Sequence, residues 1–304
     1  MSLSRKSQST FVLLIGILAV STASIFIRFA QEEAPSLVIA AYRLVFASLI
    51  LTPFALPSRL GELRSMTRAE VLLALGAGLF LAIHFATWIT SLRYTSVLSS
   101  LVIVQTSPIW VALAAPFFLK EELSGRAAAG LGFAVAGGLV VSFGDRCGPG
   151  TLASCPQGFV FYAQSLLGNF LALAGAWSSA GYLIIGRQLR PRLSLVGYIY
   201  IVYSSAAAFL VIMLFTFGHA PTGYPAQTYL WFLLLALIPQ LLGHSSFNWA
   251  LAYLPASFVA VTLLGEPVGS AVLAGILLEE IPGPLTLAGA ALILFGIYLT
   301  ARRS

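Results

Sequence analysis

Four ionisable residues stand inside long apolar segments of the chain. Arg43 occurs in "AAYRLVF", His84 in "AIHFATW", His244 in "LLGHSSF" and Glu266 in "VTLLGEPVGS". A charged side chain at the centre of a lipid bilayer costs at least about 2.5–3.5 kcal/mol on insertion scales, so it should face a cavity or a partner. All four are therefore candidate binding residues.

Arg43 and Glu266 carry opposite charges and predict complementary kinds of recognition. The planar guanidinium of Arg43 suits a carboxylate, whereas Glu266 could bind an amine or another cation, or carry a proton. The structural alternative is that the two side chains neutralise each other as an ion pair. Pro267 lacks a backbone N–H, so a helix break is expected beside Glu266. Pro108 predicts a second break, with Gln105 beside it as a hydrogen-bonding group.

The two histidines could gate a path or relay protons, because an unperturbed imidazole titrates near neutral pH. Each is followed four positions later by an aromatic or polar residue, Trp88 and Asn248 respectively. These residues and Trp249 are expected to line a cavity that binds a solute. In the alternative interpretation the histidines are hydrogen-bonded core residues and the tryptophans pack or anchor helices at the lipid interface.

The elements that position these residues must lie in lipid. Of the 304 residues, 59% are hydrophobic and only 9% are charged, whereas a soluble domain is usually about a quarter charged. A bilayer core of roughly 30 Å needs about 20 apolar residues per helix. That length predicts an all-α membrane protein with ten spans, at 10–30, 35–56, 70–91, 96–118, 125–144, 165–186, 195–217, 228–250, 256–277 and 284–301.

Ten spans place both termini on the same side of the membrane. Twelve of the sixteen Lys and Arg residues fall on that side and three at the opposite ends, with Arg43 inside a span. Such an excess marks the cytoplasmic side. The only two cysteines, Cys147 and Cys155, then share an outer loop where a disulfide could persist. Two free thiols are the alternative.

The sequence partly repeats itself at a shift of 159 residues. "SLRYTSVLSSLVIVQTSPIWVALAAPFFLKEEL" from Ser91 lies over "ALAYLPASFVAVTLLGEPVGSAVLAGILLEEIP" from Ala250, and eleven of the 48 positions from 91 to 138 are identical. Each half holds five spans, so the second half would enter the membrane from the opposite side. Inverted repeats of this kind are typical of secondary transporters, which bind solute near the midplane. The predicted units are repeats over 1–144 and 165–304, joined by an outer loop over 145–164.

These stretches, together with "GHSSFNWALAYLPA", resemble the EamA branch of the drug/metabolite transporter superfamily along nearly the whole chain. The resemblance implies a carrier in the inner membrane of a bacterium or archaeon, often an exporter of amino acids or similar small metabolites, without fixing the solute. Efflux of amphipathic drugs is the close alternative. Expected partners are a small solute, membrane lipid and, as a candidate coupling ion, protons, with the chain acting as a monomer or a homodimer.

Several features argue against other classes of protein. The sequence has no phosphate-binding GxxxxGK[ST], no HExxH and no Cys/His cluster with metal spacing, so no cofactor, metal or enzymatic activity is expected. The basic residues are not clustered, which excludes a nucleic-acid partner. A membrane enzyme that uses the histidines on a lipid, and a receptor or assembly subunit, are the remote alternatives. Gly130, Ala134 and Gly138 recur at four-residue spacing and predict a close helix contact or a dimer face.

Overall fold

The apolar segments fold as helices in the computed structural model of the chain, because a helix satisfies its own backbone hydrogen bonds away from water. The structure describes residues 5–118, 125–147, 159–250, 263 and 265–301, and within them every regular element is helical, as predicted. The elements are α1 (Arg5–Ser21), α2 (Ala23–Gln31), α3 (Ser36–Arg64), α4 (Arg68–Ser91), α5 (Val97–Val104), α6 (Ser107–Phe118), α7 (Gly125–Cys147), α8 (Phe159–Leu189), α9 (Leu195–Thr216), α10 (Ala226–Leu235), the π-helix η2 (Ala236–His244), α11 (Ser245–Ala250), α13 (Gly265–Leu277) and α14 (Pro284–Ala301).

Local sequence explains where several helices begin. Thr67 and Glu70 form a reciprocal capping box at the start of α4, in which the Thr67 N–H donates to a Glu70 carboxylate oxygen over 2.8 Å. Ser96 and Ser194 accept backbone N–H groups at the starts of α5 and α9. A side-chain oxygen at this position satisfies one of the backbone donors that a helix start leaves unpaired.

The outer surface of the bundle is apolar, as lipid requires. Large side chains such as Leu18, Phe54, Leu72 and Ile276 are more than 60% exposed, and so wide an apolar surface marks contact with a membrane. Seven helical segments are long and apolar enough to cross a bilayer, and three shorter apolar helices lie at Ala128–Val141, Gly265–Leu277 and Pro284–Leu299. The chain is a multi-pass membrane protein, while the count of ten spans stays a prediction.

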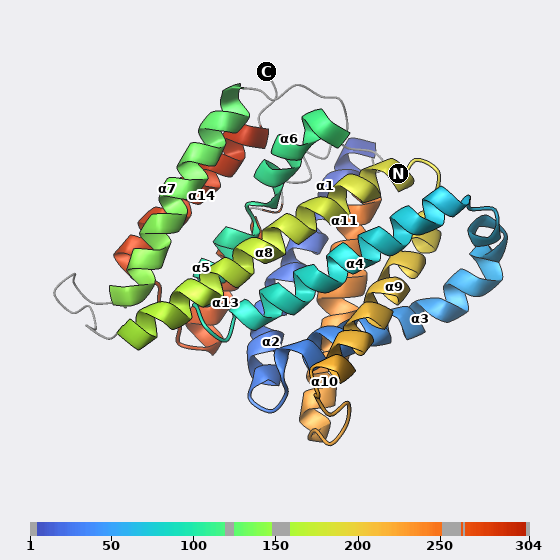
Figure 1. Cartoon of the computed structure of the whole chain (residues 1–304), viewed down its shortest axis with the longest axis horizontal. Coiled ribbons are helices and arrows are strands. Elements are labelled where there is room, and N and C mark those ends of the chain that lie inside the picture. Colours follow the sequence, from blue (N-terminus) through green and yellow to red (C-terminus); the bar gives the residue numbers. More distant parts are fainter. Residues whose placement is uncertain (1–4, 119–124, 148–158, 251–262, 264, 302–304) are drawn as a thin grey trace.

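Long helices pack in pairs drawn from distant parts of the sequence (Figure 1). α4 lies along α8 and α9, α3 lies along α9, and α1 packs against η2 and α11. The pair of α7 and α14 forms one side of the molecule. These contacts bring the first and second halves of the chain together around the short helices α5 and α13, which pack against each other.

Glycines allow α7 and α14 to touch at their backbones. A Cβ atom on Gly137 would lie 2.7 Å from the carbonyl oxygen of Gly289, and one on Gly296 would lie 2.5 Å from that of Gly130. Gly130 and Ala134, predicted from their spacing, thus serve a contact within the chain, whereas a Cβ atom on Gly138 would meet nothing within 4 Å and Gly137 takes its place in the contact. We call this contact the glycine seam.

An ion pair closes one end of the bundle. Arg28 Nη2, at the end of α2, lies 2.6 Å from Glu280 Oε1 and donates to the carbonyl oxygen of Thr95 over 3.1 Å. The other Glu280 oxygen accepts the Val97 N–H over 2.9 Å. One glutamate therefore connects the segment after α13 to both α2 and the start of α5.

Candidate functional site

The break between two short helices meets the start of a third in the interior of the bundle. α5 ends at Val104 and α6 begins at Ser107, which leaves Gln105 in the break. α13 begins at Gly265, and Glu266 lies in its first turn, where a carboxylate is favoured by the helix dipole. Gln105 Nε2 donates to Glu266 Oε2 over 2.5 Å.

Prolines fit the starts of both of these helices. Pro108 is the second residue of α6 and Pro267 is the third residue of α13. In the first turn of a helix the N–H that proline lacks has no partner within the helix, so the residue costs little there. The residues that precede Gly265 in the predicted ninth span lie largely outside the described part of the chain.

A cavity of about 70 Å³ lies beside these breaks. A water molecule needs roughly 10–15 Å³ of such space, so the cavity holds several waters. Its walls come from α1, α4, the α5–α6 break, α8, η2, α11 and α13, with Leu81, Leu183 and Phe247 among the apolar side chains. Polar side chains from both halves of the sequence also line it, namely His84, Trp88, Gln105, Ser107, Ser179, Tyr182, His244, Asn248 and Glu266.

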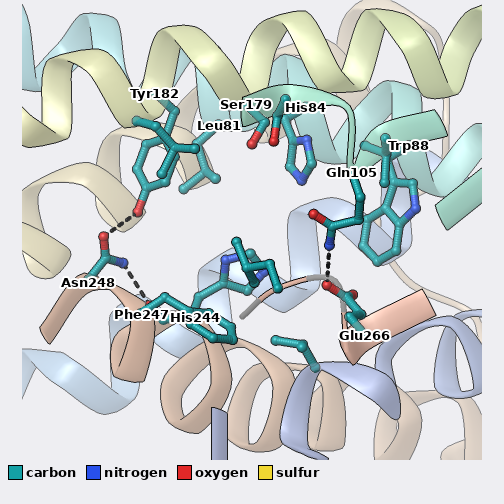
Figure 2. A pocket seen from close by; sticks show the side chains of 15 residues that line it. Leu81, His84, Trp88, Gln105, Ser179, Tyr182, His244, Phe247, Asn248 and Glu266 are labelled. Carbon is teal, nitrogen blue, oxygen red and sulfur yellow. Dashed lines mark hydrogen bonds between the residues drawn. The ribbon is translucent and has the colours of Figure 1, made fainter. Parts of the chain in front are cut away.

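Polar groups gather at two opposite ends of this cavity (Figure 2). At one end the Tyr182 hydroxyl donates to Asn248 Oδ1 over 2.8 Å, and Asn248 Nδ2 donates to the His244 carbonyl oxygen over 3.0 Å. At the other end lie Gln105 and Glu266.

The two histidines lie between these ends and are held by aromatic neighbours. His84 Nδ1 lies 2.9 Å from the carbonyl oxygen of Gly175 and therefore donates to it, while its ring stacks on Trp88 with a centroid separation of 5.9 Å. The His244 ring meets Phe85 edge-on at 5.5 Å. Both imidazoles are thus oriented by packing, and both reach the cavity wall.

Arg43 lies behind this wall and is fully buried. Its Nε donates to Gln240 Oε1 over 2.8 Å, and its guanidinium carbon lies 4.1 Å from the centre of the Phe85 ring. Among the described residues, Gln240 and not Glu266 is the side chain to which Arg43 is hydrogen-bonded.

The structure brings most of the predicted binding residues together around the cavity. His84, Trp88, Gln105, His244, Asn248 and Glu266 line it. Arg43 stands one side chain behind the wall, and Trp249 is absent from the lining and packs in a small apolar cluster with α1 residues. The predicted bond between Cys147 and Cys155 lies outside the described residues.

Sequence reasoning missed Tyr182, Ser179 and Gln240. Tyrosine and serine are common at helix surfaces, and nothing in the α8 sequence marks these two as facing a cavity. Gln240 did carry a signal, because it is an amide directly after Pro239 within an apolar segment. Pro239 and Gln240 both lie in the π-helix η2, where Gln240 has no exposed surface.

Comparison with known proteins identifies the family. The profile of the EamA-like transporter family matches residues 8–143 and again residues 166–302. An uncharacterised transporter of Archaeoglobus fulgidus is 23% identical over 98% of both chains, and the uncharacterised transporter YetK of Bacillus subtilis is 22% identical over 97% of this chain and 88% of its own.

Two further likenesses concern a relative that matches over part of its length and the fold. A probable terminal-alkyne amino-acid exporter of Streptantibioticus cattleyicolor is 25% identical over 66% of this chain and 63% of its own. A protein crystal structure with 18% sequence identity superposes with a TM-score of 0.66 over 97% of this chain and 96% of that chain. Since the family profile matches both halves of the sequence, the chain belongs to the EamA-like transporter family, and through it to the drug/metabolite transporter superfamily.

Proposed function

We propose that the protein is a secondary transporter that exports amino acids or similar small metabolites by alternating access around the cavity between Tyr182–Asn248 and Gln105–Glu266. The observation that carries the proposal is this cavity, which lies at the α5–α6 break and the start of α13 and is lined by polar side chains from both halves of the sequence. Unwound backbone at such depth is tolerated where it lines a cavity, which is how many carriers build their solute sites. The named function of the Streptantibioticus relative favours amino acids as the class of solute.

The packing of the helices supports an inverted repeat of residues 1–144 and 165–304 in this proposal. The first helix of the second half, α8, packs on the third span of the first half, α4. In the same way α1 packs on η2 and α11, which belong to the third span of the second half. Reciprocal contacts of this kind are expected from a pseudo-twofold axis in the membrane plane.

The orientation follows from the same proposal. Both termini would be cytoplasmic and the membrane would be the inner membrane of a prokaryote, because lysine and arginine favour the cytoplasmic side. The Arg28–Glu280 ion pair would then close the outer end of the bundle. Protons are the proposed coupling ion, with Glu266 as their carrier.

Proteoliposomes test the proposal. Purified protein would be reconstituted and loaded with radiolabelled amino acids one at a time, and efflux measured with and without a pH gradient against protein-free vesicles. We expect efflux of at least one amino acid. If no amino acid moves faster than in protein-free vesicles under either condition, amino-acid export is wrong.

A second cavity, which is apolar, favours efflux of amphipathic compounds as the alternative function. It measures about 290 Å³ and lies between α6, α7 and α8, next to the α5–α6 break. Ile109, Trp110, Leu173 and Phe170 supply an apolar lining, and Thr106 lies within the same break as Gln105. Efflux of hydrophobic cations from the same vesicles, without efflux of amino acids, would favour this alternative.

A further inference from the structure

Arg43 is a buried cation whose hydrogen-bond donors are mostly unused. The side chain has 0% exposure, and a guanidinium carries five N–H donors. Nε donates to Gln240, but among the described residues neither Nη1 nor Nη2 has a hydrogen-bond partner, and Gln240 Nε2 has none there either. Buried polar groups are normally satisfied, so a cluster of free donors around a positive charge needs an explanation.

The donors lie one side chain away from the main cavity. Phe85 covers the guanidinium at 4.1 Å, and its ring lies 4.8 Å from His84 and 5.5 Å from His244. Both histidines line the cavity, whereas Arg43 does not. Phe85 and the two histidines are therefore the side chains that separate the guanidinium from the cavity.

The chemistry of the free donors favours a carboxylate. Two terminal guanidinium nitrogens bind the two oxygens of a carboxylate in parallel, and the Gln240 amide adds a neutral donor beside them. Glu266 places a carboxyl group at the cavity. A doubly charged anion would be repelled by that glutamate, whereas a zwitterion places opposite charges near Arg43 and Glu266.

We propose that Arg43 and Gln240 form a subsite for the carboxylate of the transported solute, which is reached when Phe85 and His244 move aside. The inference rests on the proposed function and specifies its solute class: a zwitterion whose carboxylate points to Arg43 and whose ammonium points to Glu266. In the absence of solute, Gln240 holds the guanidinium in place through the bond to Nε.

The test compares each amino acid with its amide, which keeps the side chain and the ammonium but lacks the carboxylate. Binding of leucine and leucinamide, and of phenylalanine and phenylalaninamide, is measured by calorimetry on the purified wild-type protein. A charge-assisted bidentate pair corresponds to at least about tenfold in affinity. We therefore expect at least one acid to bind about tenfold or more tightly than its amide.

Gln240→Glu is the informative variant, because it places a carboxylate of the protein itself where the amide oxygen now accepts from Arg43. It should fold at least as stably as the wild type and lose the preference for the acid, so that acid and amide bind equally. Gln164→Glu adds the same charge at an exposed position near the start of α8 and should keep the preference.

The outcomes separate this inference from the function on which it rests. Equal binding of acid and amide to the wild type, or an unchanged preference in Gln240→Glu, overturns the subsite and leaves amino-acid export standing. If the wild type binds neither member of either pair and moves no amino acid in vesicles, the proposed function fails and the subsite fails with it.

Discussion

The glycine seam between α7 and α14 gives a stability prediction whose size follows from measured distances. In Gly137→Ala the new methyl would lie 2.7 Å from the Gly289 carbonyl oxygen and 2.8 Å from the Ile293 backbone nitrogen. Ordinary contact begins at 3.4 Å, so the helices must separate locally by 0.7 Å, the difference between 3.4 and 2.7. Because the obstacles are backbone atoms, no side-chain rotation can relieve them, and overpacking of this kind typically costs about 1–3 kcal/mol.

Gly132 provides the matched control on the same helix. A Cβ atom there meets nothing within 4 Å, so Gly132→Ala should be neutral or should stabilise α7 by up to about 1 kcal/mol through helix propensity. The two variants add the same methyl group five residues apart. Their stabilities should therefore differ by about 1–4 kcal/mol.

The assay is reversible unfolding of purified protein in mixed detergent micelles titrated with a denaturing detergent, followed by circular dichroism. Thermal denaturation monitored by size-exclusion chromatography gives an independent ranking. The reasoning would be refuted if Gly137→Ala matched the wild type while Gly132→Ala lost stability. Equal losses in both variants would show that glycine at these positions matters for a reason other than the seam.

Three further predictions concern the cavity and its surroundings. Glu266→Gln keeps an oxygen that can accept the hydrogen bond from Gln105, but the amide cannot carry a proton. Efflux driven by a pH gradient should therefore be lost while the protein stays folded. Efflux that persists under the gradient would remove Glu266 as the proton carrier. Arg28→Glu replaces a partly exposed ion pair with repulsion and should lower the free energy of unfolding by up to about 1 kcal/mol. The double variant with Glu280→Arg should recover this stability in a thermal unfolding measurement. If it does not, the backbone contacts of Arg28 matter more than its charge. Tyr182→Phe removes a buried hydroxyl donor and should lower the free energy of unfolding by about 0.5–1.5 kcal/mol, and an unchanged stability would indicate that water replaces that hydroxyl.

The sequence predicted the helical class and the break between α5 and α6. Long apolar segments can satisfy their backbone in lipid only as helices or closed sheets, and their length favours helices. Pro108 marked that break, and Pro267 lies in the first turn of α13. Glu266 stood out because a lone acid in an apolar segment is costly unless it faces a partner or a cavity.

Pairing between side chains could not be predicted, because it depends on the rotation of each helix about its axis. Direct pairing of Arg43 with Glu266 was the structural alternative to solute binding, but Gln240 takes the hydrogen bond from Arg43. Periodicity also gave no reason to expect a π-helix over Ala236–His244. Without that geometry, Gln240 is one polar residue among many.

The π-helix has a consequence for how the cavity wall could change. Its backbone bonds reach five residues back, whereas an α-helix reaches four, so conversion of η2 to α-helix would turn every later residue about the axis by one step, on the order of 100°. His244, Phe247 and Asn248 would turn together about the helix axis. Single cysteines introduced along 240–248 and treated with a thiol label would detect such a turn: on addition of solute, the set of positions that react would shift by one residue. If the reactive positions never shift, the turn is excluded. On this reasoning η2 has two helical states, and a change from one to the other would replace the side chains that face the cavity in one step.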